Sequence, residues 1–350
     1  MRRKSKKIRV GKLYIGGNAP ITVQSMTTTD TTDVDATVKQ IQELEDVGCE
    51  IIRVSAPTIE AAKALKGIKK SISIPLVADI HFDYRIALEA AKYADKLRIN
   101  PGNIGDEEKI KLVVNAAKEH GIPIRVGVNL GSLEKDLFEK YGYTSEAMVE
   151  SALRHVKILE KLDFYNTIVS LKASDVPRMV EAYRLFAKKT DYPLHLGVTE
   201  AGSKFPGTIK NSIGMGILLS EGIGDTIRVS LSDDPKEEIK AGKQILRALG
   251  LRKDGVEITS CPTCARANID VIKIVEEIEN KTEKIKKPMH VAIMGCAVNG
   301  PGECRKADIG IVGGVNNTNL LYKNGEIIGK VPKEKIVESL LGEIKAINSD

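Results

Sequence analysis

Three cysteines and one carboxylate in the last third of the sequence form a pattern that can bind a metal ion or a metal cluster. Cys261 and Cys264 make a Cys-x-x-Cys pair in SCPTCARANID, between an expected strand and an expected helix. Thiolates are stabilised at such a place by the unpaired backbone N–H groups of the helix end. Cys296 and Glu303 follow in IMGCAVNGPGEC, again after an apolar run. Three thiols from two loops therefore predict a metal site.

The fourth ligand decides between zinc and an iron–sulfur cluster. A closed zinc site usually supplies a second close pair of ligands, whereas Cys296 is followed by AVNGPGEC, in which the next cysteine, Cys304, is distant. Glu303 suits a four-iron cluster with one distinct iron, because a carboxylate oxygen is harder and more easily displaced than a thiolate. We expect residues 299–302 to form a turn that brings Glu303 back towards Cys296. Cys304 is expected to point elsewhere in an extended segment, and zinc stays open as the alternative.

The first two thirds of the sequence place cations at equivalent positions in several expected strands. Four arginines and one lysine share this position near a strand end: Arg53, Arg98, Arg125, Lys172 and Arg228. Residues i and i+2 of a strand share a face, so an arginine lies on the same face as a small polar residue nearer the carboxyl end, such as Asn100, Asn129 or Ser230. Cations that converge from several strands favour a substrate with closely spaced negative charges, such as a diphosphate. The alternative is that each cation belongs to a structural ion pair or points outward, which explains one arginine better than four.

Two further segments end strands with groups that can orient a substrate or transfer a proton. Asp79 and His81 lie in ADIHFD, and Glu200 lies in GVTEAG. A carboxylate among cations is strongly ionised, yet it can pass a proton when a substrate excludes water from it, so Glu200 is the candidate general acid or base. His81 is expected to be an oriented hydrogen-bond donor or a core histidine rather than a metal ligand.

Eight short apolar runs, separated by helix-like segments, indicate the fold that positions these residues. The runs are ITVQSM, EIIRVS, PLVADI, KLRIN, PIRVGVN, TIVSLKA, LHLGVTE and DTIRVSL. Strands that read as near-continuous apolar runs and alternate with helices are typical of a parallel sheet covered on both faces. Eight such units predict an α/β protein with a TIM (β/α)8 barrel over residues 1–252, whose ligand site lies at the carboxyl ends of the strands. A doubly wound open sheet is the structural alternative, and the long interval after PIRVGVN should carry an extra helical turn or a longer loop.

The pattern changes after residue 252, and a smaller α+β domain is expected over residues 253–350. The helix DPKEEIKAGKQILRALG opens with Asp-Pro and closes at Gly250, and VEITS, HVAIMG and DIGIVGG then read as strands. A hairpin that turns at Asn324-Gly325 and a final helix KEKIVESLLGEIKAI complete the domain. Four of the five cysteines lie in it, so the metal site is expected there.

Composition limits the class of protein. With 350 residues, 42% of them hydrophobic, the chain can bury one large core and one smaller core. No apolar stretch approaches the ~20 residues that cross a bilayer, and the basic opening MRRKSKKIRV lacks the apolar segment of a secretory signal. We therefore expect a cytoplasmic protein without membrane attachment, whose thiols bind metal rather than form disulfides.

The formal net charge of +6 arises entirely from the first segment. Its six cations are Arg2, Arg3, Lys4, Lys6, Lys7 and Arg9, and the remaining sequence balances at zero. We expect this segment to be a solvated, frayed arm. The 4% aromatic content and the absence of tryptophan argue against a surface on which nucleic-acid bases stack, so no nucleic-acid partner is expected.

Seven stretches of the sequence resemble the bacterial 4-hydroxy-3-methylbut-2-enyl diphosphate synthase family, the iron–sulfur enzymes of the methylerythritol phosphate route to isoprenoids. They are GGNAPITVQSMTTTDT, LVADIHFDYRIAL, KLRINPGNIG, IRVGVN, GVTEAG, SCPTCAR and MGCAVNGPGE, and the similarity runs through essentially the whole chain. The resemblance implies an oxidoreductase that uses two electrons to open the ring of 2-C-methyl-D-erythritol 2,4-cyclodiphosphate and to remove a hydroxyl as water, giving (E)-4-hydroxy-3-methylbut-2-enyl diphosphate. It also implies a barrel that binds the diphosphate, a 4Fe-4S cluster in the C-terminal domain, and flavodoxin or ferredoxin as the electron donor.

The resemblance also implies roles for single residues. The cluster ligands would be Cys261, Cys264, Cys296 and Glu303. The basic residues at the substrate would be Arg53, Arg98, Arg125, Lys172 and Arg228, with Asn100, Asn129 and Ser230 as polar neighbours and with Asp79 and His81 at the same mouth. Glu200 would serve in proton delivery, and Glu303 would hold the special iron until a substrate oxygen displaces it. Cys304 departs from the small residue common in the family and is expected to be a bystander, the alternative being that it competes for the iron.

The order of the elements poses a geometric problem, because the cluster domain follows the eighth helix. That helix ends at the amino-terminal face of the barrel, far from the cationic mouth. The family resolves this with a head-to-tail homodimer, in which the cluster domain of one subunit caps the barrel of the other, and we expect the same here. Two other functions stay open: a barrel condensing enzyme that acts on a diphosphate ester and carries a structural zinc lobe, and a barrel with a zinc-binding nucleic-acid module, whose binding would depend steeply on salt.

Overall fold

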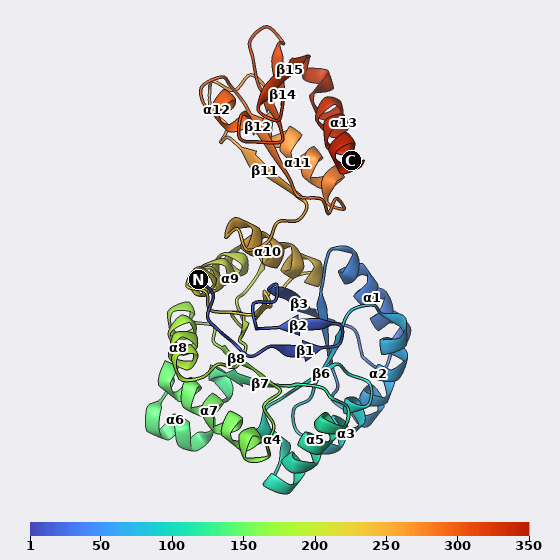
Figure 1. Cartoon of the computed structure of the whole chain (residues 1–350), viewed down its shortest axis with the longest axis vertical. Helices are drawn as coiled ribbons and strands as arrows, with labels where there is room; N and C mark the ends of the chain where they lie inside the picture. Colours follow the sequence, from blue (N-terminus) through green and yellow to red (C-terminus); the bar gives the residue numbers. More distant parts are fainter. Residues whose placement is uncertain (350) are drawn as a thin grey trace. The chain divides into compact units, whose positions relative to one another are not determined.

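The computed structural model describes residues 1–349, apart from the side chain of Pro101, and the chain forms two compact units (Figure 1). The first unit is Met1–Arg252, and the second begins at Lys253. The first unit contains a sheet of eight parallel strands, in the order β8-β7-β6-β5-β4-β3-β10-β9. The strands are β3 (Thr22–Met26), β4 (Ile51–Ser55), β5 (Leu76–Asp79), β6 (Lys96–Ile99), β7 (Ile124–Asn129), β8 (Thr167–Lys172), β9 (His195–Leu196) and β10 (Thr226–Ile227).

The ring of strands closes between β8 and the start of β9. Val169 and Leu194 form a parallel bridge at this point, and the Val169 N–H donates to the Pro193 carbonyl at 3.0 Å. The sheet is therefore a TIM-like barrel, as the eight apolar runs predict, and the doubly wound alternative is wrong. Each barrel strand lies within the apolar run that predicts it, although β9 and β10 are shorter than their runs.

Helices form the outer layer around the strands in Figure 1. The principal ones are α1 (Val34–Asp46), α2 (Ile59–Ser71), α3 (Tyr84–Ala91), α5 (Glu107–Glu119), α7 (Ser145–Lys161), α8 (Val176–Lys189), α9 (Lys204–Ser220) and α10 (Pro235–Ala248). Aspartate or threonine side chains cap most of them, as Asp234 does before α10. Shorter helices follow two strands: α4 (Pro101–Ile104) follows β6, and the 3-10 turn Leu130–Ser132 and α6 (Lys135–Tyr141) follow β7. α6 accounts for the long interval after PIRVGVN.

Alternation along each strand divides its side chains between the helix layer and the barrel interior. In β4, Ile52 and Val54 belong to the core between strands and helices, whereas Arg53 lies on the opposite face. Leu97 and Ile99 of β6 belong to the same core. Each such residue contributes ~1.5–3 kcal/mol when fully buried. The apolar positions therefore stabilise the barrel, while the alternate positions are available for binding.

The first residues form a β-hairpin that closes the base of the barrel. β1 (Ile8–Val10) pairs with β2 (Leu13–Ile15), and Figure 1 shows this hairpin across the ring of strands. Its apolar side chains pack against residues at the amino-terminal ends of three barrel strands, namely Ile51 of β4, Val77 of β5 and Ile168 of β8. The hairpin thus buries the apolar end of the barrel interior that the helices do not cover.

Hydrogen bonds and ion pairs fix the basic residues that precede the hairpin. Arg2 is 3.2 Å from Asp225, and Ser5 donates to the same carboxylate at 2.9 Å. Arg3 donates to the Thr190 carbonyl at 2.7 Å. The prediction of a solvated, frayed arm is therefore wrong, because several of its cations have partners on the barrel.

The second unit is built on a five-stranded mixed sheet in the order β11-β12-β13-β14-β15. Its strands are β11 (Val256–Ser260), β12 (Met289–Met294), β13 (Ile309–Val312), β14 (Asn319–Lys323) and β15 (Glu326–Val331). The first three are parallel, and β14 and β15 are antiparallel additions. Asn324 and Gly325 have positive φ and form the predicted turn of the hairpin.

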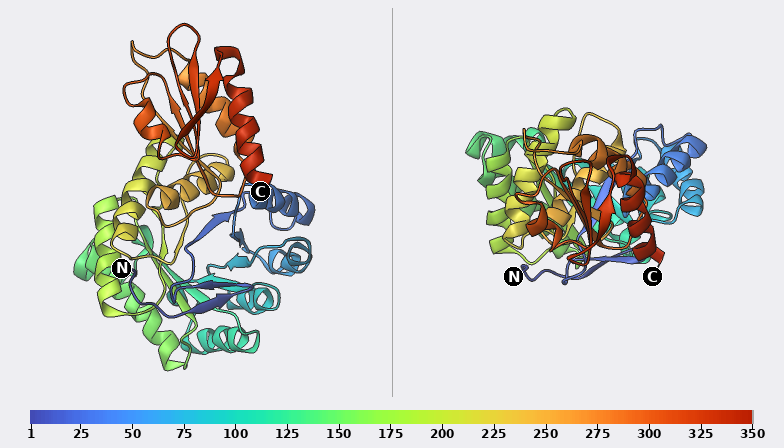
Figure 2. Two further views of the ribbon diagram at one scale, coloured as in Figure 1. Left: turned by 45° about the horizontal axis from the view of Figure 1, so that its top comes forward. Right: turned by 90° about the horizontal axis from the view of Figure 1, so that it is seen from above.

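Helices pack on both faces of this sheet. α11 (Val271–Thr282) and α13 (Ile336–Ser349) share an apolar core with alternate residues of the strands, and Figure 2 shows α13 alongside the sheet. The short α12 (Gly300–Cys304) packs on the other face, against Ala292 and Met294. Residues 299–302 therefore begin a helix, and the turn and extended segment expected there are wrong. The proline at the first turn favours the helix, because its φ is already helical. Among residues 1–349, no helix is both long and apolar enough to cross a bilayer.

Candidate active site

Asp79 lies at the carboxyl end of β5 and connects cations from the two neighbouring strands. Arg98 Nη1 of β6 is 3.0 Å from Asp79 Oδ1, and Arg53 Nε of β4 is 3.6 Å from Asp79 Oδ2. The strand register explains this arrangement, because Asp79 pairs with Ser55 on one side and with Arg98 on the other. His81 Nε2 is 3.5 Å from Asp79 Oδ1, and the His81 side chain is 49% exposed. The structure thus brings four of the predicted residues together.

The charges of this group hold Asp79 in its ionised form. Burial alone would raise the pKa of Asp79, but Arg53, His81 and Arg98 together lower it well below its ordinary range. Burial also lowers the pKa of Arg53 to about 10, although Asp79 opposes the shift. Asp79 is therefore the counter-ion that allows these arginines to lie close together.

Arg125 and Lys172 are buried with few partners. They are 1% and 7% exposed. Arg125 Nη1 donates to Ser170 Oγ at 3.2 Å, whereas its Nε and Nη2 atoms have no partner among the described residues. Burial and the neighbouring cations, Arg53 foremost, lower the pKa of Arg125, and burial and Arg125 lower the pKa of Lys172. A buried charge without a partner is costly, so this part of the barrel favours an anionic ligand.

Arg228 has a carboxylate partner on α10. Its Nε and Nη2 atoms are each 3.3 Å from Glu238, which also accepts from Ser25 Oγ at 3.0 Å and from the Leu231 N–H at 3.1 Å. The alternative of structural ion pairs therefore applies to Arg228, and in part to Arg53 and Arg98. It does not account for the buried cations Arg125 and Lys172.

The other predicted polar residues lie at the ends of β6, β7, β9 and β10 or in the segments that follow. Asn100 directly follows β6, and its buried Oδ1 atom has no partner among the described residues. Asn129 ends β7 opposite Lys172 of β8, and Ser230 is half-buried after β10. Glu200 is exposed in the loop after β9 and has a left-handed φ of 53°. Such backbone costs energy in a residue other than glycine and is concentrated at functional sites, but Glu200 lies outside the ion-pair group around Asp79.

In the second unit, two of the four predicted metal ligands follow neighbouring strand ends. Ser260, the last residue of β11, pairs with Ile293 of β12, so Cys261 directly follows this register, and Cys296 lies two residues after the end of β12. The Gly295 N–H donates to Cys261 Sγ at 3.1 Å. Cys264 is exposed, Cys296 is half-buried, and all five cysteines are free thiols. The thiols that the sequence singles out are therefore available at one edge of the sheet.

The predicted carboxylate ligand lies on α12. Glu303 Oε1 is 3.7 Å from Lys306 Nζ, in a half-exposed ion pair. Within residues 1–349, no group of three or more histidine, cysteine, aspartate or glutamate side chains is close enough to hold a metal ion. The polypeptide therefore provides the predicted ligands without bringing them into one coordination sphere.

Cys304 points into the core beneath β12 and β13. A Cβ atom on Gly310 would lie 2.5 Å from Cys304 Sγ, so the absence of a side chain at Gly310 makes room for the thiol. Burial, and to a smaller extent the charge of Glu303, raises the pKa of Cys304 to about 12. A buried thiol with a raised pKa is a poor metal ligand, so this position favours the expected bystander role of Cys304, which stays a prediction.

Comparison with known proteins shows which family shares this architecture. Residues 5–243 match the GcpE TIM-barrel domain, and residues 257–346 match the GcpE protein C-terminal domain. The chain belongs to the GcpE family. Over 347 residues it is 60% identical to the 4-hydroxy-3-methylbut-2-en-1-yl diphosphate synthase (flavodoxin) of Caldanaerobacter subterraneus subsp. tengcongensis, which covers 99% of this chain and 98% of that protein. The protein of the same name from Clostridium tetani is 59% identical over 348 residues, with 99% of each chain covered.

Solved structures of distant sequence share the barrel of this GcpE chain. The type I 3-dehydroquinate dehydratase of Clostridium difficile has a TM-score of 0.52 and 16% identity, covering 70% of this chain and 98% of that one. A dihydropteroate synthase from Stenotrophomonas maltophilia has a TM-score of 0.51 and 14% identity, with the same coverage. At this identity the likeness shows the fold alone, so it gives no support to a condensing function.

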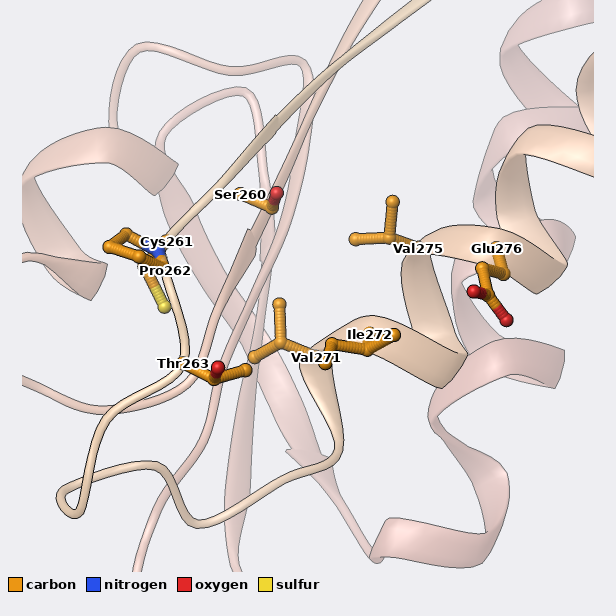
Figure 3. Close-up of a pocket in the computed structure, with 8 residues that line it drawn as sticks. All are labelled: Ser260, Cys261, Pro262, Thr263, Val271, Ile272, Val275 and Glu276. Carbon is orange, nitrogen blue, oxygen red and sulfur yellow. The ribbon is translucent and has the colours of Figure 1, made fainter. Parts of the chain in front are cut away.

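A pocket opens beside Cys261 in the C-terminal GcpE domain (Figure 3). It is lined by Ser260, Cys261, Pro262, Thr263, Val271, Ile272, Val275 and Glu276. The first turns of α11 supply its apolar wall, and Ile272 is 58% exposed. Apolar side chains of α11 therefore lie beside Cys261.

Three buried residues of the GcpE barrel were missed by reasoning from the sequence. Lys96 donates to Gln24 Oε1 at 3.3 Å, and burial and then Arg125 lower its pKa. Neither ring nitrogen of His195 has a partner among the described residues, and burial and the neighbouring cations lower its pKa. Glu238 is the carboxylate partner of Arg228. Lys96 could have been found, because it lies two residues before Arg98 and shares its face. A lone histidine in an apolar strand and a glutamate in an amphipathic helix carry no comparable signal.

Proposed function

We propose that the chain converts 2-C-methyl-D-erythritol 2,4-cyclodiphosphate into (E)-4-hydroxy-3-methylbut-2-enyl diphosphate. In this reaction the ring opens, one hydroxyl leaves as water, and two electrons and two protons are consumed. The observation that carries the proposal is the burial of the basic side chains Arg125 and Lys172 in the barrel, where Arg125 Nε and Nη2 have no partner among the described residues. The names of the two relatives, which share at least 59% of their residues with this chain, supply the product and hence the substrate class.

The barrel residues would bind the diphosphate before any chemistry takes place. The binding set is Arg53, Asp79, His81, Arg98, Asn100, Arg125, Asn129, Lys172, Arg228 and Ser230. Phosphate oxygens would supply the acceptors that Arg125 Nε and Nη2 lack. Asp79 already holds Arg53 and Arg98 in place, so these donors need little rearrangement when the substrate enters. Asn100 Oδ1 is a buried acceptor that a substrate hydroxyl can satisfy.

Glu200 would deliver the proton that the leaving hydroxyl requires. A carboxyl group is a suitable general acid when a bound substrate excludes water from it. In the ligand-free chain Glu200 is exposed on the loop after β9, with its backbone in the left-handed region. This strained position supports a role at the substrate, since such backbone is otherwise costly.

The C-terminal domain would hold a 4Fe-4S cluster through Cys261, Cys264, Cys296 and Glu303. The donor set fits, because it offers three free thiols in the loops after β11 and β12 and one half-exposed carboxylate on α12. The Gly295 N–H already donates to Cys261 Sγ, as backbone amides do to cluster thiolates. When bound, the cluster supplies the electrons that the ring opening consumes. Glu303 would give up its contact with Lys306 to act as the displaceable fourth ligand.

The partners follow from the same proposal. Two electrons must reach the C-terminal domain, and flavodoxin, which the relatives' names contain, or ferredoxin would deliver them in the cytoplasm. A head-to-tail homodimer is supported by where the barrel ends. Arg252, its last residue, donates to the Ile21 carbonyl and to Glu50, which lie just before β3 and β4. The chain thus leaves the barrel at the amino ends of the strands, while the cations lie at the carboxyl ends.

The first experiment measures iron, acid-labile sulfide and zinc per chain after purification without oxygen, in the wild type and in Cys304→Ala. We expect about four irons and four sulfides in both, together with formation of the linear diphosphate when reduced flavodoxin is supplied. Stoichiometric zinc without sulfide would contradict the proposal and favour a condensing enzyme with a zinc lobe.

The trans arrangement has its own test, in which two inactive variants are mixed. Arg125→Ala disables substrate binding in the barrel, and Cys261→Ala disables the cluster site of the C-terminal domain. If one subunit's cluster serves its partner's barrel, a refolded equimolar mixture should recover about a quarter of the wild-type activity, because half of the dimers are mixed and each contains one intact site. No recovery, or an active monomer in sedimentation experiments, would contradict the homodimer.

A further inference from the structure

A buried histidine on α7 connects two loops at the mouth of the barrel. His155 is 1% exposed, and its Nδ1 atom accepts a hydrogen bond from the Gly102 N–H at 3.3 Å. On its other side, His155 Nε2 is 3.0 Å from Glu134 Oε1, within ion-pair distance but without the alignment of a hydrogen bond. Gly102 lies on α4, in the loop after β6, and Glu134 lies between the 3-10 turn and α6, in the loop after β7. One side chain therefore contacts both loops.

The hydrogen bond from Gly102 fixes the tautomer of His155. A ring nitrogen that accepts from a backbone N–H carries no proton, so the proton of a neutral His155 lies on Nε2, the nitrogen that is 3.0 Å from Glu134 Oε1. Glu134 Oε2 accepts from Ser151 Oγ at 2.7 Å. Burial alone would raise the pKa of Glu134, but His155 and Ser151 lower it to about 2. Glu134 is thus a carboxylate held from two positions of α7.

Glycine at position 102 is required by this contact. A Cβ atom on Gly102 would lie 2.6 Å from His155 Cε1, closer than real carbon atoms approach. The obstacle is a buried ring held on both sides, so it cannot move aside easily. The close approach of α4 to α7 therefore depends on Gly102, and it places the amide within reach of His155.

Both loops lead directly to predicted substrate contacts. Asn100 is the residue before α4 and stands two positions from Gly102, and its buried Oδ1 atom has no partner among the described residues. Asn129 ends β7, five positions before Glu134, opposite Lys172 of β8. His155 itself lies on a helix of 17 residues that packs against the barrel core through Ala152 and Val156. A rigid helix thus sets the positions of two loops that carry polar groups.

We propose that His155 and Glu134 are positioning residues of the barrel site, which hold the loops after β6 and β7 so that Asn100 and Asn129 face the substrate. The inference rests on the proposed function for the identity of the substrate. The contacts of His155 with Gly102 and Glu134 lie within the barrel and are independent of that function. His155 acts here through Gly102 and Glu134 and does not take part in proton transfer to the substrate.

Three substitutions separate the two contacts of the histidine. His155→Asn places an amide oxygen near the position of Nδ1 and keeps an acceptor for Gly102, but it cannot reach Glu134. His155→Gln places an amide N–H near the position of Nε2 and keeps a donor for Glu134, but it lacks the acceptor for Gly102. His155→Ala removes both. Lys157→Ala is the matched control, because Lys157 is an exposed residue of the same helix, two positions after His155.

Hydrogen–deuterium exchange of residues 100–104 and steady-state kinetics with the cyclodiphosphate give independent readouts. We expect faster exchange at Gly102 in His155→Ala and His155→Gln, and near-normal exchange in His155→Asn and Lys157→Ala. In His155→Ala, kcat/KM should fall roughly 10- to 100-fold, mostly through KM, because misplaced binding groups cost about this much. Each single-contact variant should recover part of the loss, and iron content should not change.

Each negative result of these experiments leads to a different conclusion about His155. If His155→Ala lowers thermal stability but leaves the Gly102 exchange and KM as in the wild type, the residue is only a packing element and the proposal is wrong. If kcat falls and KM does not, the positioning role is also wrong. If the wild type itself fails to convert the cyclodiphosphate, the proposed function fails, while the exchange data still decide whether His155 holds the loop.

Discussion

The barrel site and the cysteine site differ in how much of their geometry the polypeptide supplies. In the barrel, Arg98 and Asp79 are buried on adjacent strands with 3.0 Å between their charged atoms. In the C-terminal unit, Cys264 is exposed and Glu303 is engaged with Lys306. The barrel residues stand on strands whose register is fixed by backbone hydrogen bonds, whereas the thiols stand in loops beyond strand ends. Strand register can hold like charges together without a ligand, but loops need the bound group to define their final positions.

The largest effect is expected at the cysteine site, from Cys261→Ala. Loss of one thiolate should prevent stable cluster binding and lower turnover by about 1000-fold or more, which is ~4 kcal/mol of transition-state stabilisation. Iron and sulfide analysis and the visible spectrum measure the first effect, and product formation measures the second. Cys49→Ala is the control, because Cys49 is buried in the barrel and its pKa is raised to about 12 by burial. A Cys261→Ala protein with a full complement of iron and sulfide would remove Cys261 from the ligand set.

A smaller loss is expected in the barrel, from Arg125→Gln. Hydrogen bonds to charged groups contribute ~1.5–3 kcal/mol, so kcat/KM for the cyclodiphosphate should fall roughly 10- to 150-fold while the iron content stays unchanged. Arg85→Gln is the matched control, since the Arg85 side chain is 68% exposed and pairs with Asp83. Equal losses in both variants would show that general surface charge, and not the buried cluster, attracts the substrate.

The buried cations should also cost stability in the absence of substrate. The pKa of Lys172 is lowered in the folded state, chiefly by burial and Arg125, while an unfolded lysine has a pKa of ~10.4. Between these two values the unfolded state binds more protons, so the free energy of unfolding rises with pH. Lys172→Met should remove this rise and make the ligand-free protein more stable at pH 7 by ~1–2 kcal/mol.

Urea unfolding at several pH values measures this effect, with the exposed Lys63→Met as control. A lower free energy of unfolding for Lys172→Met than for the wild type, without substrate, would contradict this prediction. In that case Lys172 would contribute packing or an interaction that outweighs the cost of its charge.

The smallest effect is expected from Cys304→Ala. Cys304 fills space beside Gly310 in the core, so its truncation should lower the free energy of unfolding of the C-terminal unit by ~1 kcal/mol. Iron, sulfide and activity should equal those of the wild type. A changed cluster spectrum in this variant would show that Cys304 contacts the cluster after all.

The sequence predicted the strands and the barrel cations because both follow a regular period. Each arginine stands in an apolar run in which alternate residues face the helices, so its position on the inner face could be deduced, as for Arg53 between Ile52 and Val54. Lys96 obeys the same rule, but it is the first residue of β6, so a pattern of cations near the carboxyl ends of strands does not include it. The network of His155 and Glu134 could not be deduced, since it joins three separate elements through a single glycine.

The errors also have physical causes. Glycine and proline in residues 299–302 are typical of turns, but proline is equally suited to the first turn of a helix, and α12 is that helix. The basic first residues were expected to be solvated, because nothing in the sequence indicates that Asp225, far along the chain, is their partner. Local composition predicts exposure, and only the fold shows which distant groups meet.

The attachment of the first residues to the base of the barrel has a consequence for biosynthesis. Arg2 and Ser5 bind Asp225, just before β10. A ribosome that adds roughly 5–20 residues per second needs about ten seconds or more to travel that far. During this time Ile8 and Val10, which are buried in the folded chain, have no completed barrel to cover them. The nascent chain would therefore present an apolar amino-terminal segment to chaperones until its last barrel strand emerges, and the long sequence separation of these contacts would slow the final closure.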